Sequence, residues 1–425
     1  MTNTSLASAG ASQKADAVFV FNPRDPDFHR MPYPHYARLR DIDPIHRGHW
    51  GVWWVAKYQH VRAILKDKRF LVQDIPAKLR RRNQMLKTQR VSANQPENID
   101  ALIENTENWF SFLDESAHGR LRKLVSAAFQ KRQIDRMREH IRNCAEGLLD
   151  QLEGRTEFDL MQDFARKLPP RVIGQFLGVP EQDIERCTQW AHMVSRILDP
   201  MLSLDEYAGM DRASQDFMVY LRELVQQRRL VPQDDLISAL ISARDNDDRL
   251  SEAEIISTLT FTFVAGEETA TALIGNTALA LMRNPDQRKL MVGDMNLVAH
   301  AVEETLRYDS PFQMTSRTAL EDVEIEGRQI RKGEQIYLFM ASANRDPEQF
   351  PDPDRFDLGR ERSHHIAFSD GAHFCVGALL ARIEVQESIA ALFSRFPALR
   401  LASEELRYCD NAVLRCLASM LVSPQ

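Results

Sequence analysis

The chain is poor in cysteine, glycine and proline. Its 425 residues include five cysteines, 17 glycines and 19 prolines. The low glycine and proline contents exclude fibrous and low-complexity proteins. The cysteines are odd in number and scattered, with no Cys-x-x-Cys pair, which argues against a disulfide framework, a zinc site and a covalently attached haem. We therefore expect a globular protein of a reducing, cytoplasmic compartment.

Neither sign of charge is in large excess. The chain carries 54 basic and 61 acidic side chains, which gives a formal net charge of −7. Proteins that coat nucleic acids are usually strongly basic, so we expect no nucleic-acid partner. Hydrophobic residues make up 44% and charged residues 27% of the chain, as is typical of a folded protein with a sizeable core.

No segment has the pattern of a secretion signal or a membrane anchor. Residues 1–16 are rich in serine, alanine and threonine without a basic start before an apolar core. We expect residues 1–17 to form a disordered tail and residues 18–425 to form a single domain. The apolar stretch Ile255–Met282 is long enough to cross a bilayer. However, Glu267 and Glu268 at its middle would each cost about 3 kcal/mol there, so we expect a buried helix and no membrane partner.

Helical patterns dominate the chain. Ser251 followed by Glu254 forms a capping box that opens the Ile255–Met282 helix, and Asn284-Pro285 ends it. Other stretches have the same period, and they predict helices at Pro34–Asp41, His60–Lys66, His118–Phe129, Gln133–Leu152, Leu160–Leu177, Asp216–Arg228, Asp286–Met291, Leu297–Tyr308 and Ala378–Phe396.

Strand patterns are few. Trp50–Val55 is an apolar, Trp-rich run, and Val323–Ile330 and Glu334–Met340 predict a hairpin that turns at the intervening glycine. Asp74–Asn108 is predicted to be long and irregular, a property that usually marks a functional or mobile segment. The patterns together predict a mainly α-helical protein with small β-sheets.

Cys375 lies in a loop with glycines on both sides, directly before the helix expected from Ala378. A helix N-terminus stabilises a thiolate through its dipole and free N–H groups, although a lone cysteine is more often an inert buried residue. The segment Phe368–Gly377 matches F-x-x-G-x-H-x-C-x-G at all five fixed positions. This pattern resembles the cysteine-ligand loop of the cytochrome P-450 superfamily, the haem-thiolate monooxygenases, in their soluble bacterial form.

The resemblance covers nearly the whole chain, and it implies a fold, a cofactor and an activity. It implies one haem-thiolate monooxygenase fold, shaped as a triangular prism, with the long central helix crossing over the haem. Cys375 is then the proximal ligand of a non-covalent haem b, with Phe368 and Gly377 beside it. The implied activity is that of an O₂-dependent hydroxylase or epoxidase, because a thiolate ligand favours O–O cleavage.

The segment from Ala265 to Thr269 resembles the family's oxygen-activation sequence, A-G-x-[D/E]-T. Thr262, Ala265 and Thr269 share one helix face of small residues. From the residues alone, this face suits either a flat cofactor or simple helix packing. The resemblance gives Glu268 and Thr269 catalytic roles in proton delivery and places Ala265 against the cofactor. Glu267 lies about 100° away from Glu268 around the helix, so we expect it to be aimed elsewhere.

Two further motifs predict a structural charge cluster. Glu304 and Arg307 can pair on one helix face, which alone is a weak signal. Their spacing resembles the family's E-x-x-R, and the segment from Pro353 to Phe356 resembles its P-x-R-F. The resemblance implies that Glu304, Arg307 and Arg355 form a buried cluster that supports the cysteine loop.

Four residues are candidates for binding the two carboxylates of the cofactor. His118 and Arg122 match H-x-x-x-R, Arg317 follows at the expected place, and His373 lies two residues before Cys375. Each could be an ordinary surface residue when taken alone. The resemblance implies that they supply the cationic and donor groups that buried carboxylates require.

The resemblance places the substrate pocket beside the central helix. It lines this pocket with Phe261, Thr262, Ala265, Phe312 and Met314. Such an apolar lining suits a lipophilic small molecule, for example a polyketide or another secondary metabolite. The sequence does not identify the molecule.

The chain has no flavin, dinucleotide or iron–sulfur motif, so its electrons must come from separate proteins. One basic region either docks an acidic ferredoxin or forms a solvated helix face. Its residues are Arg120, Lys123, Lys131, Arg132, Arg136, Arg138 and Arg142. Two alternatives to an O₂-dependent enzyme are a peroxide-driven peroxygenase and a catalytically silent haem-binding module. Both are disfavoured because the acid–threonine pair Glu268-Thr269 is present.

Overall fold

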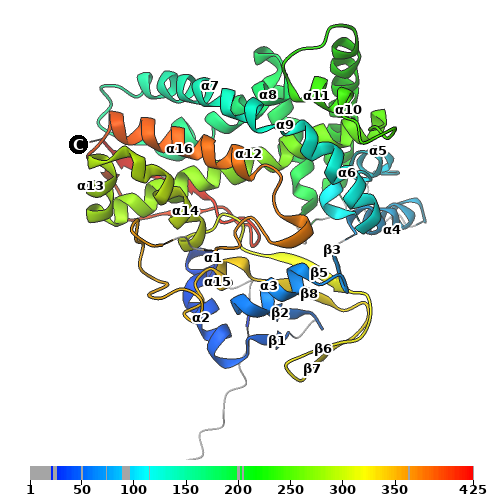
Figure 1. Ribbon diagram of the computed structural model, residues 1–425, viewed down its shortest axis with the longest axis horizontal. Coiled ribbons are helices and arrows are strands. Elements are labelled where there is room, and N and C mark those ends of the chain that lie inside the picture. The colour runs from blue at the N-terminus through cyan, green and yellow to red at the C-terminus, as the bar shows by residue number, and fades with distance from the viewer. Residues whose placement is uncertain are drawn as a thin grey trace, which may run out of the picture.

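The structure, a computed structural model, describes residues 21–22, 26–48, 51–72, 74–88, 96–113, 115–198, 202, 205–361 and 364–424. The predicted tail, residues 1–17, lies outside this part of the chain. A large helical body sits above a smaller part that holds the main sheet (Figure 1). The predicted mainly α-helical fold with small sheets is confirmed.

Sixteen α-helices lie in the described part of the chain. Their bounds are α1 Pro26–Arg30, α2 Pro32–Ile42, α3 Tyr58–Lys66, α4 Ile75–Thr88, α5 Asp100–Thr106, α6 Glu115–Ala128, α7 Lys131–Asp150, α8 Leu168–Leu177, α9 Ile184–Ser195, α10 Glu206–Leu230, α11 Leu236–Ser242, α12 Glu252–Arg283, α13 Pro285–Gly293, α14 Val298–Tyr308, α15 Met340–Ala343 and α16 Ala378–Arg395.

The longest helix, α12, runs through the centre of the helical body (Figure 1). Its capping box forms as predicted, because the Ser251 N–H donates to the Glu254 carboxylate at 2.8 Å and the Glu254 N–H donates to the Ser251 hydroxyl at 3.3 Å. It packs against α8, α14 and α16. A Cβ added at Gly266 would lie 3.0 Å from Cδ1 of Ile173 on α8. Glycine at this position therefore allows the two helices to approach closely.

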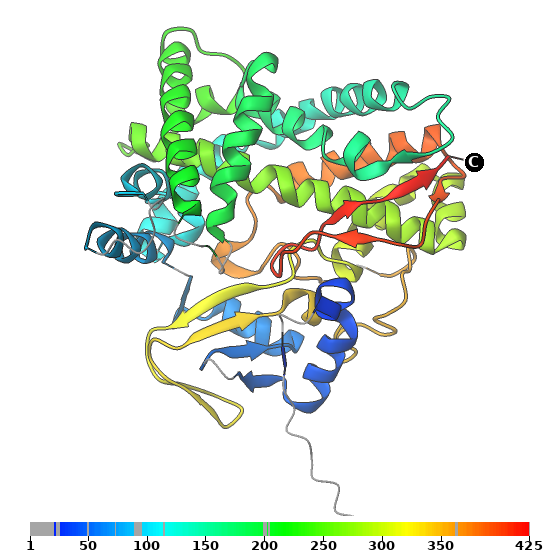
Figure 2. The same cartoon turned by 180° about the vertical axis from the view of Figure 1, so that it is seen from behind.

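Within the described ranges, the strands form four small sheets. The largest has the order β1-β2-β8-β5-β3, and β2 and β8 are its parallel pair. Its strands are β1 Ile45–Arg47, β2 Trp53–Val55, β8 Gln335–Leu338, β5 Thr315–Ala319 and β3 Phe70–Val72. The smaller sheets contain β4 Phe158–Asp159, β12 Leu421–Ser423 and β9 Arg400–Leu401; β10 Arg407–Tyr408 and β11 Leu417–Ser419; and β6 Val323–Ile325 and β7 Arg328–Ile330. Figure 2 shows the C-terminal strands, in red, lying along one side of the helical body.

Two predictions about segments are wrong. The expected hairpin does not turn at Gly333, because β6 pairs with β7 through a tight turn at Glu326 and Gly327, where φ is 46° and 76°. Strand β8 instead pairs with β2 and β5. The segment Asp74–Asn108, predicted to be irregular, contains α4 and α5. Buried apolar residues such as Leu79 and Leu102 anchor these two helices in the core, and the surrounding charges hid this pattern.

The buried apolar side chains form one large core within the helical body and two smaller clusters in the part that holds the main sheet. Across the described ranges, no helix combines the length and the apolarity needed to span a bilayer.

Candidate active site

The Cys375 thiol lies in the loop that precedes α16. The Cys375 N–H donates to the Phe368 carbonyl at 2.9 Å, and the backbone N–H groups of Gly377 and Ala378 lie close to the sulfur. Protein surrounds the thiol, yet its surface remains accessible, as expected of a residue that lines an internal binding site. Burial raises the pKa of Cys375, whereas these N–H groups and the Arg122 guanidinium oppose that rise.

The loop reaches this shape through one glycine in particular. Gly371 has φ +75°, and a Cβ there would lie 3.2 Å from the Leu65 carbonyl oxygen. Gly377, by contrast, has φ −81°, which other residues adopt easily. The Arg382 guanidinium covers the Phe368 ring at 4.6 Å from its centroid, which fixes the aromatic side chain beside the thiol.

The structure brings the four predicted carboxylate-binding residues together beside Cys375. The rings of His118 and His373 stack with centroids 4.0 Å apart. Arg122 and Arg317 both act electrostatically on His373, and Arg122 also acts on the Cys375 sulfur. Nε2 of His118 and Nδ1 of His373 are buried and have no hydrogen-bond partner among the residues that the structure describes. Buried polar atoms of this kind normally have a partner, so these two point to a ligand.

This group of donors has no acidic partner within the described ranges. Arg317 is buried, and the hydrogen bonds of its guanidinium go to the Ser316 carbonyl at 2.8 Å and the Thr315 hydroxyl at 3.4 Å. Burial lowers the pKa of Arg317 to about 10, and burial with neighbouring positive charge lowers the pKa of His373 to about 3. A buried arginine without a carboxylate calls for an anionic ligand. The residues therefore fit a cofactor that places carboxylates beside the thiol.

The predicted face of α12 also forms. Ala265 is exposed, although the preceding residues Phe263 and Val264 are buried. The Thr269 hydroxyl donates to the Ala265 carbonyl at 2.7 Å, and the Thr262 hydroxyl donates to the carbonyl one turn earlier at 2.7 Å. Because its proton is committed, the Thr269 oxygen is left with lone pairs that can accept a hydrogen bond.

Glu268 is held by α9, which sequence reasoning missed. Its Oε1 lies 2.8 Å from Nδ1 of His192 and 3.3 Å from the Ser195 hydroxyl. The hydrogen bond to Glu268 raises the pKa of His192. Glu267 is more deeply enclosed, and burial with the adjacent Glu268 charge raises the pKa of Glu267 to about 7. Nothing in the local sequence marks His192, because it meets Glu268 only through helix packing.

The predicted pocket residues divide into two groups. Phe261 packs against an aromatic cluster that sequence reasoning did not single out, namely Trp109, Phe110 and Phe112, with centroids 5.1 to 6.0 Å away. Phe261, Thr262 and Ala265 share α12, and Phe312 forms a β-bridge with Leu414. Met314 is 5% exposed and belongs to the small cluster around Tyr36 and Phe339. Its side chain therefore packs in a core rather than on the α12 face.

The charge cluster forms, but with a different third member. Arg307 and Glu304 are buried and pair at 2.8 Å. The second guanidinium on Glu304 belongs to Arg360, at 3.0 Å, whereas the Arg355 side chain is 64% exposed and lies 3.6 Å from Asp357. The prediction for Arg355 is corrected accordingly: its backbone carbonyl, not its side chain, contacts Arg307, at 3.1 Å.

The basic region is partly neutralised by acids of the same chain. Arg120, for example, pairs with Asp248 at 2.7 Å and also with Glu254. Five of the seven predicted residues form such ion pairs: Arg120, Lys123, Arg136, Arg138 and Arg142. The surface is therefore less basic than the sequence suggests.

A cofactor that carries carboxylates and is held through its iron by a thiolate requires an accessible thiol beside cationic and hydrogen-bond donors. The described residues around Cys375 provide both, and these donors have no acidic partner among them. The central helix α12 carries the acid–threonine pair Glu268-Thr269, with the Thr269 hydroxyl one turn from Ala265. Together these features are those of a haem-thiolate enzyme. The chain matches Cytochrome P450 over residues 42–415. It belongs to the cytochrome P450 family, and it is a haem-thiolate monooxygenase.

Known relatives are similar over almost their whole length. The chain is 37% identical to the biotin biosynthesis cytochrome P450 of Bacillus subtilis strain 168, covering 93% of this chain and 97% of the relative. It is 35% identical to the polyketide biosynthesis cytochrome P450 PksS of the same strain, covering 95% and 98%. It also resembles the crystal structure of P450BioI in complex with acyl carrier protein carrying hexadec-9Z-enoic acid, with a TM-score of 0.84, 36% identity and coverage of 93% and 99%.

Proposed function

We propose that the protein is an O₂-dependent monooxygenase that hydroxylates or epoxidises a lipophilic small molecule, such as a polyketide or another secondary metabolite. The observation that carries this proposal is the accessible Cys375 thiol beside two buried and two partly buried donors that have no acidic partner among the described residues. Cys375 would hold the iron of haem b through its thiolate. The cofactor's carboxylates would be held by His118, Arg122, Arg317 and His373. Bound haem supplies the iron that activates O₂, and thiolate ligation favours O–O cleavage.

The chain itself would supply proton transfer. The Thr269 oxygen can accept a hydrogen bond on the Ala265 face of α12 because its own proton goes to the Ala265 carbonyl. Glu268 is the adjacent residue of α12, and its Oε1 lies 2.8 Å from Nδ1 of His192. The His192 side chain is 65% exposed, so it can exchange protons with solvent and pass them to the Glu268 carboxylate.

The apolar side chains around α12 support a lipophilic substrate. Phe261 and its aromatic neighbours on the α5–α6 connection provide a wall without charge. Two of the relatives are named for biotin and polyketide biosynthesis, and one structural relative holds a fatty acyl chain on a carrier protein. These names support a substrate with a long apolar portion, either free or attached to a carrier.

We propose a separate ferredoxin-type protein as the electron donor, because the chain has no flavin or iron–sulfur motif of its own. The basic residues on α6 and α7 are the proposed docking surface. The internal ion pairs of Arg120 and Lys123 weaken its positive charge, so electrostatic steering by this surface is expected to be modest.

Turnover with two alternative oxidants tests this proposal. The haem-loaded enzyme is screened against macrolactones and against fatty acids, free and carrier-bound, and binding is scored by the spin-state shift of the haem. The compound that binds best is then incubated either with NADPH, a ferredoxin and its reductase in air, or with hydrogen peroxide alone. We expect oxygenated product with the first system. Product formed with peroxide only, or no product from any compound that shifts the spin state, would contradict it.

A further inference from the structure

Two cysteines that take no part in the proposed reaction lie opposite each other, directly after β10 and directly before β11. Tyr408 pairs with Leu417 between β10 and β11, so the next position places Cys409 opposite Cys416. The Cys409 N–H donates to the Cys416 carbonyl at 2.9 Å. Directly opposed residues of antiparallel strands have Cα atoms about 4.5–5.5 Å apart. This separation falls within the range of about 4.4–6.8 Å that a disulfide bond needs.

The two sulfurs differ in protonation. Nη2 of Arg166 lies 3.5 Å from the Cys409 sulfur, and the same atom donates to the Leu417 carbonyl at 3.0 Å. The neighbouring Cys416 side chain, together with the Arg166 guanidinium, lowers the pKa of Cys409 below that of an ordinary thiol. The neighbouring Cys409 side chain and burial raise the pKa of Cys416, whose thiol donates to the Leu417 carbonyl at 3.5 Å. Cys409 is thus the better nucleophile, and Cys416 remains a protonated neighbour.

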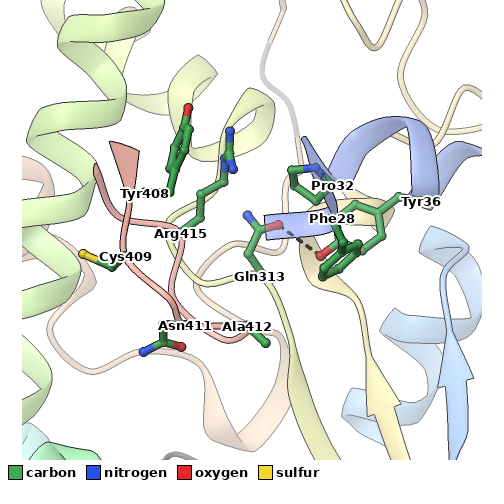
Figure 3. Close-up of a pocket in the computed structure, with 9 residues that line it drawn as sticks. All are labelled: Phe28, Pro32, Tyr36, Gln313, Tyr408, Cys409, Asn411, Ala412 and Arg415. Carbon is green, nitrogen blue, oxygen red and sulfur yellow. Dashed lines mark hydrogen bonds between the residues drawn. The ribbon is translucent and has the colours of Figure 1, made fainter. Parts of the chain in front are cut away.

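Cys409 is also more exposed than Cys416. Cys409 is half-buried and lines a small pocket with Asn411, Ala412 and Arg415, whereas Cys416 is only 4% exposed. Figure 3 shows the Cys409 sulfur pointing away from Gln313 and toward a neighbouring helix. Cys409 is thus the more exposed of the two cysteines, and Cys416 lies opposite it across the strand pair.

The other two cysteines outside the cysteine loop, Cys144 and Cys187, lack these features. Cys144 is half-buried like Cys409, but burial raises its pKa. Cys187 is fully buried, and burial raises its pKa to about 12. Cys144 is therefore a matched internal control, because it is as exposed as Cys409 but its thiol is not activated by a lowered pKa.

We propose that Cys409 and Cys416 are a redox-active pair that hydrogen peroxide converts into an intramolecular disulfide. The Cys409 thiolate attacks one peroxide oxygen and breaks the O–O bond, and after protonation this leaves a sulfenic acid and one water. The Cys416 thiol then gives up its proton and attacks the Cys409 sulfur, which forms the S–S bond and releases a second water. Two thiols lose two electrons, and one peroxide is reduced to two waters.

The disulfide closes a loop of residues 410–415 that contacts the proposed pocket region. The Gln313 N–H donates to the Val413 carbonyl at 2.8 Å, and Leu414 forms a β-bridge with Phe312. A covalent link at the base of this loop restricts its movement against Phe312. Formation of the disulfide itself does not depend on the proposed substrate or on turnover.

Peroxide titration of the reduced, haem-loaded full chain tests the pair. Peroxide is raised in steps until the first thiol outside the haem loop is oxidised, free thiols are then alkylated, and the protein is digested with trypsin. Cleavage after Arg407 and Arg415 separates the two cysteines, so the disulfide joins the peptides 408–415 and 416–425. We expect these linked peptides as the first oxidation product, with Cys144 still alkylated, and we expect dithiothreitol to separate them.

Two variants and one rate complete the test. Cys416→Ser should stop at a sulfenic acid on Cys409 that dimedone traps, and Cys409→Ser should leave Cys416 reduced at the same dose. Iodoacetamide at pH 7 should alkylate Cys409 at least about tenfold faster than Cys144, because more of Cys409 is thiolate. Oxidation of Cys144 before Cys409, or equal alkylation rates of Cys144 and Cys409, would overturn the proposal.

Discussion

At the scale of single residues, two adjacent carboxylates on α12 have different surroundings. Glu268 reaches His192 and Ser195, and its partner His192 is largely exposed. Burial and the Glu268 charge raise the pKa of Glu267 to about 7, and no direct bond ties its carboxyl to α9 among the described contacts. Only Glu268 is linked to solvent through an imidazole, which is why we assign the proton relay to it.

Thr269→Ala is expected to lower the yield of product per electron severalfold and to raise the release of hydrogen peroxide. The substitution removes a hydroxyl whose oxygen is free to accept a hydrogen bond on the Ala265 face, because its proton goes to the Ala265 carbonyl. The residues proposed to hold haem are left unchanged. Glu268→Gln should slow turnover with a smaller rise in peroxide, because proton supply falls while the hydroxyl remains. The measurement is the ratio of product to peroxide in steady turnover.

Glu267→Gln is the matched control, since it alters the neighbouring carboxylate of the same helix. It should leave the ratio of product to peroxide close to that of the wild type. If Glu267→Gln shifted the ratio as strongly as Thr269→Ala while Glu268→Gln had no effect, the assignment of the relay to Glu268 would be wrong.

At the scale of secondary-structure elements, α14 holds the cysteine loop through two neighbouring acids. Glu304 turns toward Arg307 and Arg360 and accepts the Asp357 N–H at 3.1 Å, which ties α14 to the segment before the loop. Glu303 turns toward α16, where it meets Arg382 at 2.6 Å, and toward His365 at 3.2 Å. One helix thus fixes both the approach to the loop and the helix that follows it.

Arg360→Ala should lower the free energy of unfolding by about 3 kcal/mol, because it removes a nearly buried partner from the Glu304 charge. Arg355→Ala should change it by no more than about 0.5 kcal/mol, since that side chain is mostly exposed. Urea unfolding of the two variants makes the comparison between two arginines of the same segment. A larger loss for Arg355→Ala than for Arg360→Ala would restore the motif-based assignment.

At the scale of the whole molecule, the contacts that Glu303 of α14 makes with His365 and Arg382 affect how the free energy of unfolding changes at low pH. Although burial favours the neutral form, hydrogen bonds from His365 and Arg382 lower the pKa of Glu303 to about 2. A carboxyl group whose pKa is lower in the folded state stabilises the protein above its unfolded pKa of about 4.3. This contribution is lost as the pH falls toward the folded pKa.

Glu303→Gln is therefore expected to destabilise the protein by a constant amount above about pH 5. The difference from the wild type should shrink between about pH 4.3 and pH 2, because the wild-type carboxyl becomes protonated in this window. Unfolding free energies measured across this pH range make the comparison. A difference that stayed constant down to pH 2 would show that the Glu303 charge does not contribute.

Local spacing was enough to predict much of the molecule. The capping box at Ser251 and the central helix α12 follow from patterns within a few turns of chain. Contacts between distant segments were not predictable in this way. Arg355 and Arg360 lie in an irregular stretch where no helix or strand period sets the direction of a side chain, so the motif selected the wrong arginine. His192 was missed for a related reason, because only the packing of α9 on α12 brings it to Glu268.

The ferrous–CO spectrum of the haem-loaded protein and of its Cys375→Ser variant tests the central claim most directly. Thiolate ligation by Cys375 predicts a strongly red-shifted Soret band in the wild type, loss of that band in Cys375→Ser, and an unchanged band in the control variant Cys409→Ser. A wild-type band at the position of a histidine-ligated haem, or a red-shifted band that persists in Cys375→Ser, would contradict it.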